Sequence, residues 1–91
     1  MKAESFNGDA DMTATAYVLI SVSVGTARSV YEKMLKIPGL QHVDAISGPY
    51  DLIAIVQGGD FNQIGALVLD KIQTIEGVMD TITCNVIHFE V

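Results

Sequence analysis

The chain repeats one short pattern at a fixed distance. Ile37-Pro38-Gly39 is echoed by Ile75-Glu76-Gly77, and the two isoleucines, like the two glycines, lie 38 positions apart (75 − 37). In each copy a segment with helical periodicity ends at the Ile-x-Gly step, and a strand-like run precedes and follows it. Two strand–helix–strand units in succession predict an α+β fold of βαββαβ order. This is the ferredoxin-like sandwich, with two helices on a four-stranded antiparallel sheet.

The spacing of apolar residues places six elements. Strands are expected at 16–24, 42–47, 52–56 and 80–91, and helices at 27–36 and 61–74. The first and third strands are the most apolar, so they should be central, and the second should be an edge strand. Thr26 and Asp60 are the expected N-caps of the helices. In the last strand the alternation changes parity after Val86, which suggests a β-bulge or a change of pairing partner.

Composition limits the partners of this domain. Five Lys and Arg residues face eleven Asp and Glu residues, for a formal charge of −6, and an acidic surface repels phosphate backbones. Direct nucleic-acid binding is therefore not expected. No apolar run approaches the roughly 18 residues that a membrane span requires, and the single cysteine, Cys84, precludes an intrachain disulfide. Both features favour the cytoplasm.

The chain is expected to divide into a flexible leader, residues 1–15, and one domain, residues 16–91. The hydrophobic content of 49% is high for so small a domain. A chain of this size cannot bury that much apolar surface alone, so we expect it to associate with itself.

Catalysis and metal binding have little support. His42 and His88 are the only histidines, and histidines on edge or terminal strands are more often surface residues than catalytic bases. Cys84 occupies an inward-facing strand position, where a thiol is usually a small core residue and not a nucleophile. No cluster of ligands has metal-binding spacing, so we expect neither a metal nor a cofactor.

The turn Gly48-Pro49-Tyr50-Asp51 is the strongest candidate for a binding site. It presents backbone N–H groups, an aromatic ring and a carboxylate, which together are suited to hold the carboxylate and ammonium of an amino acid. From the residues alone, a plainer interpretation is better supported: Asp51 caps the turn and Tyr50 packs at an interface. Thr81 and Thr83 place two hydroxyls on one face of the last strand, although threonine is common in strands without any ligand.

The run 43–54, which contains this turn, resembles the Gly-x-Tyr/Phe-Asp segment of the ligand-binding (RAM) domain of the Lrp/AsnC transcription regulators. The Ile-x-Gly step at 75–77, followed by Thr81-x-Thr83, is similar to the last helix-to-strand passage of that domain. The resemblance covers about 16–91. It implies a sheet-to-sheet homodimer of the dimeric αβ-barrel type, further assembly up to an octamer, and an amino acid or related metabolite held between dimers. Matched by position, the implied ligand-binding residues are Gly48, Tyr50, Asp51, Asp60, Thr81 and Thr83.

Full-length regulators of this family carry a DNA-binding module before the domain, and we expect this chain to be the stand-alone type. The first hypothesis is a non-enzymatic effector-binding module of transcription regulation that co-assembles with a full-length Lrp/AsnC regulator. The alternative is a small dimeric αβ-barrel enzyme, such as a monooxygenase or isomerase, which would need a polar pocket between the sheets. An ACT-like domain, which joins its sheets side by side, is a third hypothesis. Asp51→Ala is expected to weaken ligand binding without unfolding the chain.

Overall fold

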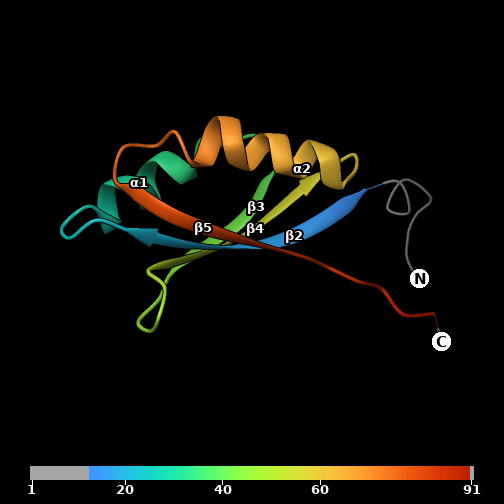
Figure 1. Cartoon of the computed structure of the whole chain (residues 1–91), viewed down its shortest axis with the longest axis horizontal. Coiled ribbons are helices and arrows are strands. Elements are labelled where there is room, and N and C mark those ends of the chain that lie inside the picture. Colours follow the sequence, from blue (N-terminus) through green and yellow to red (C-terminus); the bar gives the residue numbers. More distant parts are fainter. Residues whose placement is uncertain (1–12, 91) are drawn as a thin grey trace.

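The computed structural model describes residues 13–90 and places two helical segments on one face of an antiparallel sheet (Figure 1). The elements are β2 (Ala14–Val22), α1 (Ala27–Met34), β3 (Leu40–Ala45), β4 (Leu52–Gly58), α2 (Phe61–Leu67), η2 (Val68–Ile72) and β5 (Val78–Asn85). The strand order β3-β4-β2-β5 confirms the predicted βαββαβ topology, with the two apolar strands in the centre. Residues 1–12 of the expected leader lie outside the described part, and β2 begins two residues earlier than expected.

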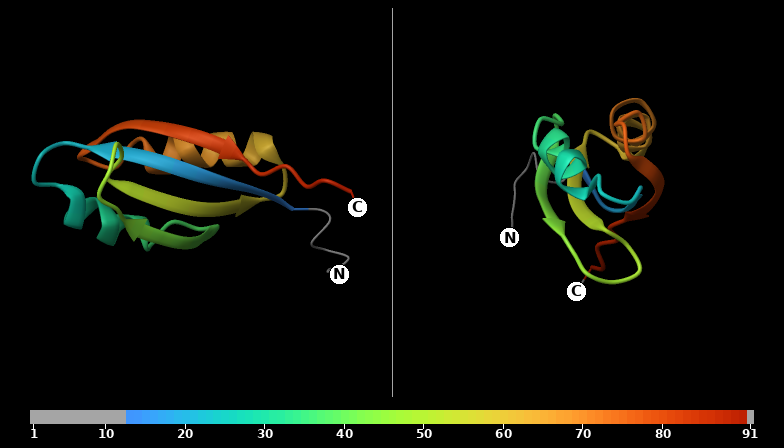
Figure 2. Two further views of the ribbon diagram at one scale, coloured as in Figure 1. Left: turned by 90° about the horizontal axis from the view of Figure 1, so that it is seen from below. Right: turned by 90° about the vertical axis from the view of Figure 1, so that its left-hand side faces the viewer.

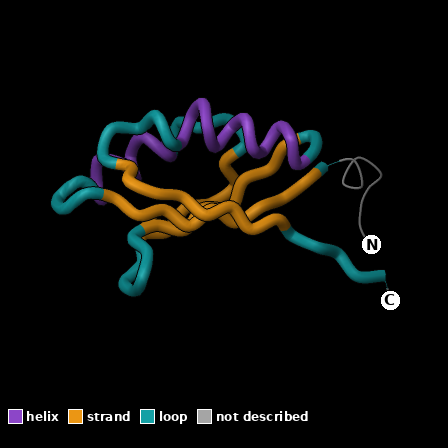
Figure 3. Tube along the Cα trace, in the orientation of Figure 1, coloured by secondary structure: helices purple, strands orange, loops and turns teal. Residues whose placement is uncertain are grey.

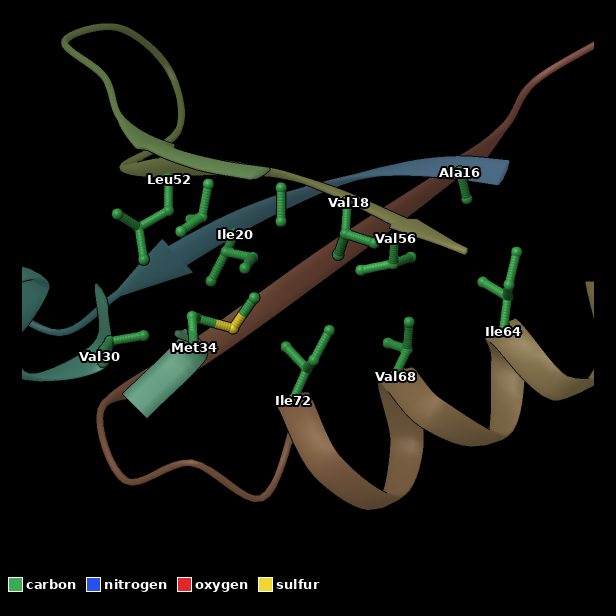
Figure 4. Packing of buried hydrophobic residues seen from close by; sticks show 12 residues of the cluster. Ala16, Val18, Ile20, Val30, Met34, Leu52, Val56, Ile64, Val68 and Ile72 are labelled. Carbon is green, nitrogen blue, oxygen red and sulfur yellow. The ribbon is translucent and has the colours of Figure 1, made fainter. Parts of the chain in front are cut away.

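The hydrophobic core lies between the helical layer and the sheet. Viewed end on, α1 and α2 lie side by side over the same face (Figure 2). The buried residues of the two central strands alternate along the chain; they are Ala16, Val18, Ile20, Leu52, Ala54 and Val56. The helices meet them with Val30, Met34, Ile64, Val68 and Ile72 (Figure 4). None of the helices in the described part is long and apolar enough to cross a membrane.

The second helical segment, which Figure 3 shows as one continuous helix, changes from α-helix to the wider π-helix at Val68. Its buried residues Ile64, Val68 and Ile72 are spaced by four, and each such step in an ideal α-helix overshoots a full turn by about 40°. The N–H of Gln73 donates to the carbonyl of Val68 at 2.8 Å, which is the i→i+5 bond of a π-turn. The wider turn keeps all three side chains directed at the sheet (Figure 4). Phe61, the first residue of α2, is 46% exposed and does not belong to the core.

The repeated Ile-x-Gly step forms two equivalent turns. Gly39 has a φ of +88° and Gly77 a φ of +103°, values that favour glycine. A Cβ on Gly39 would lie 2.6 Å from the backbone oxygen of Gln57, and one on Gly77 would lie 2.8 Å from Oγ1 of Thr26. In both places the chain leaves a helix and enters a strand through a space that only glycine fits. The sequence repeat therefore reflects a repeated helix-to-strand turn.

One of the two predicted N-cap residues forms a side-chain capping bond and the other does not. Asp60 caps α2 as expected, since its Oδ1 accepts from the N–H of Gln63 at 2.8 Å. Thr26 forms no cap bond to α1; its hydroxyl donates instead to the carbonyl of Ser23 at 2.7 Å. Thr26 therefore occupies the predicted N-cap position, with its carbonyl accepting from the N–H of Val30 at 2.9 Å, but its hydroxyl closes the preceding turn and does not cap the helix.

The last strand ends at Asn85 and not at 91, and its irregularity lies at the opposite end from the one expected. Asn85 pairs with Ala16, close to the beginning of β2, so the chain beyond it runs out of partner strand. The register shift falls between Ser21 and Val22, where β5 begins. The change of parity after Val86 thus marks the end of pairing and not a bulge.

Candidate functional site

The predicted turn is the loop that joins β3 to β4. It is closed by the N–H of Ile46, which donates to the carbonyl of Asp51 at 2.9 Å. Gly48 is exposed, its φ lies outside the left-handed region, and a Cβ there would meet nothing within 4 Å. Tyr50 is half-buried. Within residues 13–90, neither the backbone conformation nor a close contact therefore requires glycine at position 48.

Asp51 connects this loop to the central strand β2. Its N–H donates to the carbonyl of Ile20 at 2.9 Å, and its Oδ2 accepts from the N–H of Val22 at 2.9 Å in a partly buried position. Val22 lies at the register shift, where regular pairing with β5 is interrupted. The carboxylate thus satisfies a backbone donor at the end of β2. This contact gives Asp51 a structural role, although it bonds the end of β2 and not its own turn as the plainer interpretation had it. It also changes the expectation that removal of Asp51 leaves stability intact.

Asp51→Ala is expected to lower the free energy of unfolding by about 1–3 kcal/mol, because it leaves the Val22 N–H partly buried and unpaired. Asp51→Asn keeps an acceptor oxygen, so its free energy of unfolding should fall by less. Asp44→Ala removes an exposed carboxylate and should change stability by no more than about 0.5 kcal/mol. Urea unfolding of the three variants at one protein concentration provides the measurement. Equal losses for Asp51→Ala and Asp44→Ala would contradict the role assigned to the Val22 contact.

Thr81 lies at the same end of the sheet as the loop. It pairs with Ile20 of β2, on the far side of that strand from β4, and Thr83 lies two residues further along β5. The hydroxyl of Thr81 accepts from Nε2 of Gln73 at 2.8 Å, whereas Thr83 is exposed. Strand β2 separates this pair from Asp51, so one chain does not bring the two halves of the predicted site into contact.

Asp60 lies at the opposite end of β4 from the loop. It follows Gly58, the last residue of that strand, and its side chain caps α2 through Gln63. The side chain of Gln63 in turn accepts from the N–H of Gly59 at 2.9 Å. Within one chain Asp60 has a structural role and does not join the other predicted ligand-binding residues.

The sheet face without helices (Figure 2), which we call the open face, carries an apolar centre. Strand register arranges the centre as two neighbouring rows; these are Ile55-Tyr17-Cys84 and Ile53-Leu19-Ile82. Polar residues surround them; these are Thr15, Gln57, Ser21, Asp80, His42 and Asp44. Tyr17 is 42% exposed and Ile82 40%. An apolar centre within a polar margin is the usual arrangement of a protein interface.

Three residues considered for chemistry also lie outside the core. Cys84 is exposed on the open face, so its inward assignment was wrong. The error has a physical cause: β5 is an edge strand, and its helix-facing positions are taken by threonines and not by its apolar residues. His42 lies on the margin of the open face, 3.0 Å from Asp44, and His88 is exposed beyond β5. Among residues 13–90 no group of three or more acidic, histidine or cysteine side chains is placed to hold a metal ion.

A hollow of about 340 Å³ lies between the first turns of α1 and the end of β3. It is lined by Ala27, Arg28, Tyr31 and Ala45. The sequence reasoning missed this site because no motif marks it. The sequence feature that could have indicated it is the pair Ala27 and Ala45, two small residues in a helix and a strand that otherwise meet through larger side chains.

Comparison with known proteins agrees with this architecture. The model of the Lrp/AsnC ligand binding domain matches residues 15–89. An uncharacterized HTH-type transcriptional regulator of Pyrococcus abyssi is 36% identical over 76 residues, which cover 80% of this chain and 51% of the relative. The chain thus spans about half the length of the curated relatives it matches.

Solved structures share the fold. TTHA0845 from Thermus thermophilus has a TM-score of 0.79 at 29% identity, covering 86% of this chain and 98% of its own. The regulator NMB0573 of Neisseria meningitidis, in complex with L-Met, has a TM-score of 0.79 at 21% identity, covering 97% of this chain and 59% of its own. The second likeness concerns the fold alone. Together with the family match and the βαββαβ sheet, these findings show that the chain belongs to the Lrp/AsnC ligand-binding domain family.

Proposed function

We propose that this chain is a non-enzymatic module of transcription regulation that assembles through its open face and binds an amino acid near the loop between β3 and β4. The observation that carries the proposal is the open face, whose apolar centre is left uncovered by the helices of its own chain. A second copy would bury Tyr17, Leu19 and Ile82 against the same residues, as a two-fold symmetric interface requires. The polar margin would then lie at the rim.

Gly48 supports a ligand site between subunits. A glycine that neither φ nor crowding requires within its own chain suits a place where another molecule approaches the backbone closely. Its neighbour Tyr50 offers a ring to wall such a site. An amino acid fits the proposal because a structural relative is complexed with L-Met, and family membership makes ligand binding the expected activity. Asp51 would act mainly by holding the loop in place.

A full-length regulator of the same family is the partner we propose beyond a second copy. The curated relatives are named as HTH-type transcriptional regulators, and the part of each that matches this chain would carry a comparable open face. Mixed assembly through that face would place this chain, which carries a formal charge of −6, beside a DNA-binding subunit without contacting DNA itself. Such a partner would place the chain in the cytoplasm.

The enzyme alternative finds less support in the geometry. A catalytic dimer of this type would need polar groups in the space between two sheets. On the open face the central positions are apolar, and His42 lies at the margin beside Asp44. The relatives named as transcriptional regulators favour the regulatory function as well.

Calorimetric titration with each of the twenty amino acids tests the ligand proposal. We expect saturable binding by one or a few of them, and its loss in Gly48→Val. Because a Cβ at Gly48 would meet nothing within 4 Å among the described residues, this variant should unfold at nearly the same urea concentration as the parent. Ala66→Val, on the exposed side of α2, is the matched control and should bind normally. Failure of every amino acid to bind, or equal binding by Gly48→Val, would overturn the amino-acid site.

A further inference from the structure

We infer that the hollow between α1 and β3 is a second ligand site, which takes small carboxylic acids without an amino group, such as 2-oxo acids. This inference goes beyond the amino-acid site proposed above, because the hollow is formed within one chain. Its lining side chains come from the first turns of α1 and the last residue of β3. No second subunit is needed to complete it.

The hollow arises where two short side chains face each other. Further along α1, Val30 and Met34 fill the space above the sheet and are fully buried. At the first turn the facing residues are Ala27 and Ala45, whose methyl groups leave the space open. Ala45 pairs with buried Leu52 and so lies on the helix-bearing face, yet it is exposed. The exposure of a helix-facing strand residue shows that nothing in the described chain covers this part of the sheet.

The polar side chains of the hollow select for acceptors. Arg28 provides a guanidinium with five donors, and Tyr31 provides a hydroxyl. Among the described residues no carboxylate forms an ion pair with Arg28, although Glu32 is one turn away. A ligand carboxylate would neutralise the charge of Arg28 and accept two parallel hydrogen bonds from its guanidinium. A neighbouring keto oxygen would add an acceptor for the same donors.

An ammonium group would find no partner in the same place. The four lining residues include no Asp or Glu, so an amino acid would place its positive charge beside Arg28. A 2-oxo acid has the same carbon skeleton without that charge. The volume of about 340 Å³ lies near the lower end of the range for ligand pockets, about 300–1,000 Å³. It therefore suits a metabolite of amino-acid size, whose apolar body would lie against the alanine methyls and the Tyr31 ring.

The test compares 3-methyl-2-oxobutanoate with valine, which has the same carbon skeleton, in NMR titrations of the ¹⁵N-labelled protein. We expect the oxo acid to give saturable shifts at the amides of Ala27, Arg28, Tyr31 and Ala45, and valine to give none there. Arg28→Gln removes the charge, and Ala45→Leu fills the space. Each should weaken binding at least about tenfold.

Two controls match these changes elsewhere on the chain. Lys33→Gln removes a positive charge from the same helix, and Ala66→Leu adds the same bulk to an exposed position of α2; both should bind within about twofold of the parent. The inference is overturned if the oxo acid gives no saturable shifts at the lining residues, if valine shifts them equally, or if Lys33→Gln weakens binding as much as Arg28→Gln. These readouts use different residues from the Gly48→Val test, so either site can fail while the other stands.

Discussion

Tyr17→Asp is expected to dissociate the assembled protein into monomers. Tyr17 occupies the middle of a row on the open face, between Ile55 and Cys84. In a sheet-to-sheet dimer each copy would bury a new carboxylate without a partner, and a symmetric interface carries the change twice. An unpaired buried charge costs about 3–5 kcal/mol. Since each ~1.4 kcal/mol changes an equilibrium constant about tenfold, the dimer dissociation constant should rise by about a hundredfold or more.

Sedimentation velocity over a range of protein concentrations measures this effect. Ala66→Asp adds the same charge to an exposed position on the helical layer and should sediment as the parent does. Circular dichroism of both variants checks that the chain stays folded, which is expected because Tyr17 does not belong to the core cluster. A folded Tyr17→Asp protein that sediments as the parent would rule out assembly through the open face.

Gly39→Ala is expected to be strongly destabilising, by about 2–5 kcal/mol, because two penalties combine. The residue has a φ of +88°, which an L side chain adopts at a cost. Its new Cβ would also lie 2.6 Å from the backbone oxygen of Gln57. Backbone cannot move aside as a flexible side chain does, and the N–H of Gln57 already donates to the carbonyl of Gly39 at 2.9 Å. The substitution therefore forces the α1–β3 turn away from β4.

Gly25→Ala separates the two penalties. Gly25 has nearly the same φ, +85°, but a Cβ there would meet nothing within 4 Å. The free energy of unfolding of this variant should fall only by the cost of the backbone conformation, about 1–2 kcal/mol. Urea unfolding of both variants at one protein concentration gives the difference, which measures the clash with Gln57. Similar losses in the two variants would show that the close approach at Gly39 is relieved without cost.

Much of the fold could be predicted because two signals in the sequence agree. Strict alternation in β2 places Ala16, Val18 and Ile20 in the core, and a continuous apolar run marks β4 as the other central strand. The Ile-x-Gly repeat predicts the two helix-to-strand turns because both depend on a backbone conformation that one residue type adopts easily. These are local constraints, so they can be read along the chain.

The misplaced residues depend on neighbours that the sequence does not reveal. The parity of β5 was inferred from its own apolar residues, but its facing is set by pairing with β2, which turns Cys84 outward. The sequence predicted the residues of the candidate site but not how they are arranged in space. Asp51 was identified as a turn carboxylate, whereas its bond to Val22 and the distance of Asp60 along β4 follow only from the packing of strands. The hollow lined by Arg28 depends on which alanines face each other, which no single segment predicts.

The bond from Asp51 to Val22 has a mechanical consequence. It ties the loop that would receive an effector to the strand that carries Tyr17 and Leu19 toward a neighbouring subunit. A ligand that displaces the loop must therefore either stretch this tie or pull on the end of β2, where the register with β5 already shifts. Ligand binding at the loop and the packing of one sheet against another would in this way be coupled through a single carboxylate. Lengthening that side chain by one methylene, as in Asp51→Glu, would loosen the linkage while keeping its charge.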